Sequence, residues 1–240
     1  MTHQPIPVVG GLCDEQAPIP QPVMDQYHYL NTPVRAEAQY PTTPNASQTV
    51  PGASMEAAAT ASSAVSSAMV GGGYSSDVMS FGTSRSVSQL EVTGPRSATS
   101  IGSSFLKDLK LAGGVLTIDS VASRAVVTTT GAGATVSGGT TISGLEVGGI
   151  PISVDGSGIH ADGNTVPADT AVEAVKSILA NAGVQLYATA PTKQVSGGSG
   201  TYRAGSLVVV MDVDHAGPKD DVVVVFGGAE ATAAATLPYV

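Results

Sequence analysis

The feature that most constrains this fold is a long stretch of alternating apolar and small polar residues between Leu109 and Phe226. Within it, Gly114 to Gly131 (GVLTIDSVASRAVVTTTG) follows a period of two, the spacing of a strand with one dry face and one wet face. Ser and Thr form the wet face, and no Lys or Arg occurs between Arg124 and Lys176. This pattern predicts a mainly β protein and favours an extracellular or assembled one over a cytosolic enzyme.

The composition limits both the core and the partners. Charged residues make up 12% of the chain, against about 25% in an average globular protein. Aromatic residues are 4% and Trp is absent, so Val, Ile, Leu and Ala must build the core, which suits a thin sandwich or a curved sheet. The net charge of −9 and the scattered basic residues argue against nucleic-acid binding. No apolar run reaches about 20 residues, so we expect no transmembrane segment.

The N-terminal part of the sequence differs from the rest in composition. Residues 1–52 are rich in Pro, which predicts an extended linker. Residues 53–70 suit either a helix or an extended segment, with a slight preference for the latter. We therefore predict a Pro/Ala/Ser-rich extended segment over 1–73 and a β-rich domain over 74–240. The only cysteine, Cys13, excludes an intrachain disulfide, and no signal peptide is recognisable in this chain.

The fold class we predict is a mainly antiparallel curved sheet or sandwich with one helix packed on it. The helix is expected at 168–182, where Val172, Val175, Ile178, Leu179 and Ala182 fall on one face. A Gly/Ser loop is expected at 196–200. Continuous apolar runs at 207–214 and 221–226 predict a central hairpin that is covered on both faces. Strands are expected near 84–93, 98–111, 114–130, 134–147, 150–154, 158–161, 184–190, 201–214 and 221–236.

Two acidic stretches are candidate metal sites. Asp212, Asp214, Asp220 and Asp221, with His215 between them, could hold Ca²⁺. An EF-hand match fails there because Ala216 and Val223 occupy ligand positions, and an acidic, solubilising hairpin tip is the plainer interpretation. The second stretch contains Asp155, Ser157, His160, Asp162 and Asn164, and its Asp-Gly and Gly-Asn pairs are ordinary turn chemistry.

Motifs for catalysis are missing from the sequence. No nucleophile motif, phosphate loop or cofactor fingerprint is present, so we predict a protein that is not an enzyme and needs no cofactor.

Four segments carry a family resemblance: 35–41 (RAEAQYP), 109–125 (LKLAGGVLTIDSVASRA), 142–155 (ISGLEVGGIPISVD) and 225–233 (VFGGAEATA). They are similar to exported actinobacterial surface proteins of the choice-of-anchor type. The resemblance implies export and display at the cell surface, and it brings no catalytic residues.

The preferred hypothesis is a non-enzymatic exported or cell-surface protein in structure, adhesion or assembly, with a homo-oligomer or a surface partner. Long strands without Lys leave edges open to pairing, and residues 35–70 of a neighbour could add to an edge at 84–93 or 221–236. An alternative is a carrier of an apolar small molecule, in which Val175, Ile178 and Leu179 face Val208, Val210, Val223 or Val225. A hydrolase with an unrecognised carboxylate pair is the third hypothesis.

Overall fold

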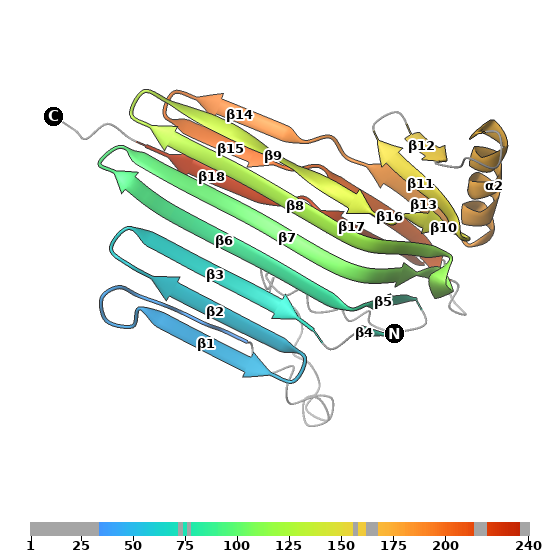
Figure 1. The fold of residues 1–240 in the computed structure, drawn as a ribbon, viewed down its shortest axis with the longest axis horizontal. Helices are drawn as coiled ribbons and strands as arrows, with labels where there is room; N and C mark the ends of the chain where they lie inside the picture. The colour runs from blue at the N-terminus through green and yellow to red at the C-terminus, as the bar shows by residue number, and fades with distance from the viewer. Residues whose placement is uncertain are drawn as a thin grey trace. The chain divides into compact units, whose positions relative to one another are not determined.

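The computed structural model describes residues 34–71, 74–75, 78–155, 158–161, 168–213 and 220–235. Its first layer is an antiparallel sheet with the order β1-β2-β3-β6-β7-β8, so that the long strands form a meander (Figure 1). On the other side of β8, β9 pairs with residues 120–130 of β8 and β10 pairs with residues 116–117 of β8. Strand β5 pairs with β7 on the same side of β7 as β6 does. The strands are β1 (Asn45–Val50), β2 (Ala53–Ala59), β3 (Ser63–Val70), β4 (Tyr74–Ser75), β5 (Met79–Phe81), β6 (Thr83–Gly94), β7 (Ser97–Leu111), β8 (Leu116–Thr130), β9 (Gly133–Ser143), β10 (Glu146–Val147), β11 (Ile150–Asp155) and β12 (Gly158–Ala161).

The second layer consists of two small antiparallel sheets, with the orders β13-β16-β17 and β14-β15-β18. Its strands are β13 (Val184–Ala188), β14 (Thr192–Ser196), β15 (Ser199–Arg203), β16 (Ser206–Val213), β17 (Asp220–Gly227) and β18 (Glu230–Ala234). Backbone bonds continue across the break between the two sheets, from Thr189 N–H to Ser206 O (2.8 Å) and from Ala204 N–H to Ala229 O (2.9 Å). The layer is therefore one three-stranded meander in which every strand bends at the same level.

Helix α2 (Ala168–Asn181) covers one end of the larger core. Its buried residues Ala171, Val175 and Leu179 recur every fourth position and so form one stripe. Gly183 ends the helix with a φ of 63°, a left-handed conformation that suits glycine. The stripe packs in a core with leucines, isoleucines and valines from β7, β8, β11, β13 and β16. A short 3₁₀ turn, η2 (Ala112–Gly114), joins β7 to β8.

A second core lies where the β14-β15-β18 sheet crosses β7 and β8, and its buried residues are four alanines with Val127 and Tyr202. Ala125 of β8 packs with Ala231 and Ala233 of β18. A side chain at Gly102 would place its Cβ 2.2 Å from the carbonyl oxygen of Glu230. The two layers therefore approach each other backbone to backbone at this point, which only glycine permits.

The structure confirms the predicted fold class: it is mainly β with antiparallel sheets, and one α-helix lies within the described residues. The helix and most strands fall close to their predicted ranges. The loop predicted at 196–200 is shorter than expected, because only Gly197 and Gly198 separate β14 from β15 as a tight hairpin turn. The predicted strands 201–214 and 221–236 are each divided, into β15 and β16 and into β17 and β18.

Two further expectations need correction. The hairpin of β16 and β17 is not covered on both faces, since Val223 and Val225 are 59% and 53% exposed. The predicted boundary between an extended segment, 1–73, and a domain, 74–240, falls inside the first sheet, because β3 pairs with β6 and the compact unit begins at Val34. Residues 53–70 are extended, as strands β2 and β3. The Pro-rich residues 1–33 lie outside the described residues.

The contact at Gly102 predicts a sharp steric effect. We expect Gly102→Ala to destabilise the fold by about 1–3 kcal/mol, because the added methyl group meets a backbone oxygen that cannot move aside. Gly139→Ala is the matched control, since nothing lies within 4 Å of a Cβ there. Thermal unfolding of both variants should show a lower Tm for Gly102→Ala only; equal Tm values would refute the close approach of the layers.

Candidate interaction surface

Strands β1, β2, β3 and β6 form a part of the first sheet that we call the wing (Figure 1). None of their residues is buried, whereas β8, two strands further on, has seven buried positions in its pattern of burial. Among the described strands, those of the second layer pack on β7, β8 and β9. The wing thus continues the sheet beyond the region that the second layer covers.

One face of the wing, the inner face, continues the face that the second layer covers on β8. Residues directly opposite each other in a sheet share a face. One such row runs from the buried Ala125 to the edge of the sheet through Gly102, Ser88, Ser66, Ala57 and Ala46. Every residue in this row is Ala, Gly or Ser. The same register places no charged residue on the inner face of β1, β2, β3 or β6.

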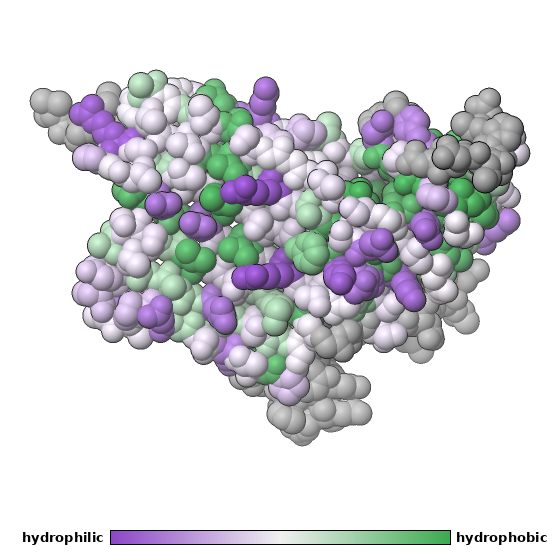
Figure 2. Space-filling model, in the orientation of Figure 1, coloured by the Kyte–Doolittle hydropathy of each residue, from purple (hydrophilic) through white to green (hydrophobic). Residues whose placement is uncertain are grey.

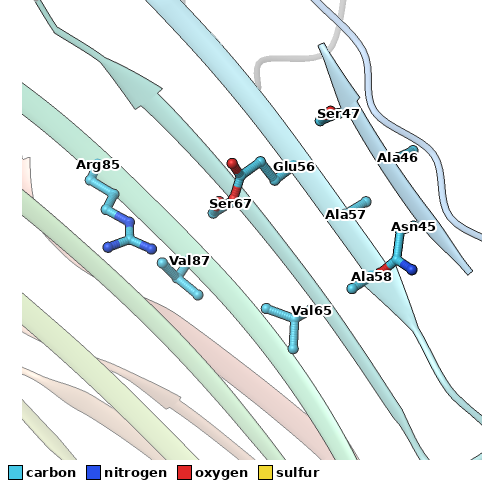
Figure 3. A pocket seen from close by; sticks show the side chains of 10 residues that line it. All are labelled: Asn45, Ala46, Ser47, Glu56, Ala57, Ala58, Val65, Ser67, Arg85 and Val87. Atoms are coloured by element: carbon cyan, nitrogen blue, oxygen red, sulfur yellow. The ribbon is translucent and has the colours of Figure 1, made fainter. Parts of the chain in front are cut away.

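The outer face of the wing carries its charges. Glu56, Arg85 and Glu91 lie there with Ser, Thr and a few Val side chains. Figure 2 looks onto this side of the first sheet, where hydrophilic residues are scattered among pale and apolar ones. An open trough of about 410 Å³ crosses β1, β2, β3 and β6, with Val65, Val87, Glu56 and Arg85 among its lining residues (Figure 3). The trough is shallow and mixed in character, and its shape indicates no particular small ligand.

The edge strand of the wing is β1. Ala59 N–H donates to Pro44 O at 2.8 Å, which fixes the phase of the β1–β2 ladder. Because hydrogen-bonded pairs alternate in an antiparallel ladder, Ala46, Gln48 and Val50 bond to β2. The backbone N–H and C=O groups of Asn45, Ser47 and Thr49 consequently point away from β2, toward the sheet edge.

Residues 34–38 approach β1 without joining its ladder. The backbone bridge between Gln39 and Thr43 turns the chain back. Arg35 N–H then donates to Gln48 Oε1 at 2.5 Å, and Gln48 is an inner-face residue. In the described part of the chain, no backbone hydrogen bond joins 34–38 to β1. The segment therefore lies at the inner-face rim and leaves the ladder positions of β1 open.

The four aspartates proposed as a Ca²⁺ site are only partly placed. Asp212 of β16 is opposite Asp221 of β17 in the backbone register, and Val213 is opposite Asp220. The side chains of Asp220 and Asp221, and all of Asp214, lie outside what the structure describes. Among the residues that are described, no three His, Cys, Asp or Glu side chains gather as metal ligands would. The metal site remains a prediction from sequence.

The second oxygen-rich stretch forms a hairpin of β11 and β12, with Asp155 opposite Gly158. His160 Nε2 lies 3.1 Å from Asp155 Oδ1, and both side chains are about half exposed. Such an exposed pair contributes little to stability. Ser157, Asp162 and Asn164 lie outside the described residues.

The carrier hypothesis placed an apolar cavity under α2, and the residues are arranged differently. Val175 is a buried core residue, and Val223 and Val225 are on the outward face of β17, so these three do not line a common cavity. Of the predicted residues, Leu179 and Val210 do line one open space. An open groove of about 460 Å³ does exist between α2, β12 and the edge of β13. Its apolar lining includes Ile159, Leu179, Val184 and Val210, with Lys176 and Asp212 also present.

Comparisons with known proteins add no relative. Protein-family models, curated proteins and solved structures each give no match to this chain. No described helix has the length and apolarity needed to cross a bilayer.

Sequence reasoning preferred an extended structure for 53–70 and predicted a strand at 84–93, where the structure has β2, β3 and β6. The division of 53–70 into two strands that pair with each other and with β6 was missed, because Ala and Ser dominate β2 and β3 and have no strong strand preference. A usable signal was the Pro51-Gly52 turn, followed by two short stretches in which small apolar residues alternate with polar ones.

The absence of buried side chains in the wing predicts a local difference in stability. At low protein concentration, amide hydrogens of β2 and β3 should exchange about tenfold faster or more than those of β7 and β8, because opening the wing exposes little apolar surface. Hydrogen exchange measured by mass spectrometry tests this. Equal protection across the sheet would show that the wing unfolds only with the whole domain.

Proposed function

We propose that this chain is a non-enzymatic, exported or cell-surface structural protein that assembles with copies of itself. The observation that supports this most is the wing, whose inner face carries only uncharged residues and which ends in β1, an edge strand among the described strands. Monomeric proteins usually protect such edges with Lys, Pro inside the strand, or a covering segment. Strand β1 has no charged residue, and its flanking prolines, Pro44 and Pro51, stand outside it.

The dimensions of the wing favour pairing of strand edges over stacking of faces. Four strands about 4.8 Å apart and six to twelve residues long cover roughly 500 Å². A stable interface buries about 800 Å² on each partner, so stacking of wing faces alone is too small. Edge pairing adds backbone hydrogen bonds to the contact and joins the two wings into one sheet.

The phase of β1 defines the contact. Asn45, Ser47 and Thr49 offer their N–H and C=O groups at the edge, so an antiparallel second copy of β1 can pair about a two-fold axis at Ser47. Asn45 of one copy then lies opposite Thr49 of the other, and no like charges meet. Export and surface display are supported by the Ser/Thr-rich composition and by the family resemblance.

A proline at position 47 tests this function. Ser47→Pro removes the outward N–H but no donor to β2, so we expect the fold and Tm to persist while self-association falls at least tenfold. Ser47→Ala, which keeps the N–H, is the control and should associate like the natural chain. Sedimentation velocity over a dilution series is the measurement. If Ser47→Pro folds and associates normally, assembly through β1 is wrong.

A second candidate, the carrier of an apolar ligand, is favoured only by the groove beside α2. Ala180 is exposed on α2 and lines the groove, while Ser177 is exposed on α2 and does not. The carrier hypothesis predicts saturable binding of a fluorescent fatty acid that Ala180→Trp abolishes and Ser177→Trp leaves intact. Absence of saturable binding by the natural chain, or an equal effect of both variants, would remove this candidate.

A further inference from the structure

One edge of the second layer is open toward the wing. Strand β18 packs on β7 and β8, whereas its neighbour β15 packs on β8 and β9. The other side of β18 is therefore the side of β6 and the rest of the wing. Within the described strands of its sheet, β18 pairs with β15 alone. We call the space between this side of β18 and the inner face of β6 the slot.

The backbone of β18 directs hydrogen-bonding groups into the slot. Ala204 N–H donates to Ala229 O and Ala235 N–H donates to Gly198 O, both at 2.9 Å, which fixes the phase of the β15–β18 ladder. Because hydrogen-bonded pairs alternate in an antiparallel ladder, three residues of β18 point away from β15: Glu230, Thr232 and Ala234. The carbonyl of the first of them lies against β7. The other two direct two N–H and two C=O groups into the slot.

The floor of the slot is apolar and uncharged. Leu90 and Val92 of β6 share rows across the first sheet with Val127 and Thr129 of β8, which are buried beneath the second layer. The two β6 side chains lie on the same inner face, but they are 43% and 47% exposed. Large apolar side chains beside an unpaired strand edge suit the addition of an extended segment to a sheet.

The floor and the backbone groups lie side by side. Glu230 lies over Gly102 of β7, which is opposite Ser88 of β6. Ala235 lies near Thr130, at the other end of the sheet. Strand β18 thus runs in the same direction as β6, and the second half of β18 lies beside the two exposed apolar side chains of β6.

We propose that the slot binds an extended segment of a partner protein, which adds to β18 as an antiparallel fourth strand of the β14-β15-β18 sheet. The partner residue that faces Ala233 points to the floor, where Leu90 and Val92 favour an apolar side chain. The partner residue that faces Glu230 shares the outer face with this carboxylate, which favours Lys or Arg. The slot therefore recognises a strand in which an apolar residue is followed three positions later by a basic one.

Charge and space favour a foreign strand as the occupant. Glu230 is the only charged residue of β18, and the inner face of the wing has none, so the net charge of −9 favours a basic partner. A second copy laid beside β18 in the same orientation would place its first sheet on the wing. An inverted copy would have to insert its own wing, whose edge, β1, the proposed assembly engages. The slot itself does not depend on that assembly.

A charge exchange tests the register. A capped, fluorescent peptide of sequence TTVTAKTT places its Val opposite Ala233 and its Lys opposite Glu230, and it should bind the natural chain saturably. Replacing the peptide's Lys with Glu should weaken binding about fivefold or more, and Glu230→Lys should reverse this preference. Glu91→Lys is the matched control, because Glu91 is exposed on the outer face of β6 and should leave the preference intact. Fluorescence anisotropy is the measurement.

The backbone contact is tested with a proline. Thr232→Pro removes an N–H in the slot but no donor to β15, so peptide binding should fall about tenfold or more. Thr232→Ala loses the same hydroxyl contact to Thr201 Oγ1 (3.1 Å) but keeps the N–H, and should bind normally. Circular dichroism verifies folding. If Thr232→Pro does not fold, N-methylation of the peptide's fourth residue, which faces Thr232, should weaken binding to the natural chain, and N-methylation of its Val should not.

Three results would overturn the proposal: no saturable binding by the natural chain, equal binding of the Lys and Glu peptides, or normal binding by folded Thr232→Pro. Sedimentation velocity tests a second copy as the occupant. Thr232→Pro should associate like the natural chain, and a loss of association would assign the slot to a second copy and make the proposal wrong. Ser47→Pro should bind the peptide normally, so a failure of the slot is distinguished from a failure of the contact at β1.

Discussion

The close approach of the two layers at Gly102 is the contact on which the rest of this structure depends. Because β18 lies directly against the backbone of β7, the core between them is lined mostly by alanines, and Tyr202 is its one buried aromatic residue among the described residues. A chain with 4% aromatic residues can close a sandwich in this way. The second layer is narrow: its three long strands cover β7, β8 and β9, and the wing extends beyond them.

The bend of the second layer is fixed by polar groups of the first. Ala229 N–H donates to Ser123 Oγ at 3.0 Å, and Thr140 Oγ1 lies 2.9 Å from Ser123 Oγ and 2.5 Å from Gly205 O. Since Thr140 has a single hydroxyl hydrogen, a consistent chain runs from Ala229 through Ser123 and Thr140 to Gly205. Buried backbone groups at the bend are satisfied by this chain. Tyr202 OH adds a bond of 2.9 Å to Gly138 O. The Ser and Thr residues thus serve inside the sandwich as well as on its surface.

Sequence patterns predicted strands and helix well because long period-two and period-3.6 stretches are strong signals, as in β8 and α2. They failed where burial depends on a neighbour that is distant in sequence. The valines of β17 suggested a central strand, but a run of valines does not indicate whether one face of the strand or both faces are covered. In β8 the alternation of buried side chains skips one position, because Ile118 and Val121 are buried and are three residues apart. The irregularity lies opposite Asp108 of β7, which has a φ of 56°. No described arrangement of side chains supports the Ca²⁺ hypothesis. The edge positions of β1 and β17 are visible only in the pairing of the strands.

The same composition that thins the core also determines how the sheet edges behave. Charged residues, Lys above all, prevent an edge strand from pairing with another chain. With ten Lys and Arg in 240 residues, this chain has few such residues to place at its sheet edges. In β1 the interruptions stand at the strand ends, as the prolines Pro44 and Pro51. Such ends limit the length of a pairing without preventing it. An edge that is uncharged in the middle and blocked at its ends favours one register over slipped ones, which is what an ordered assembly requires.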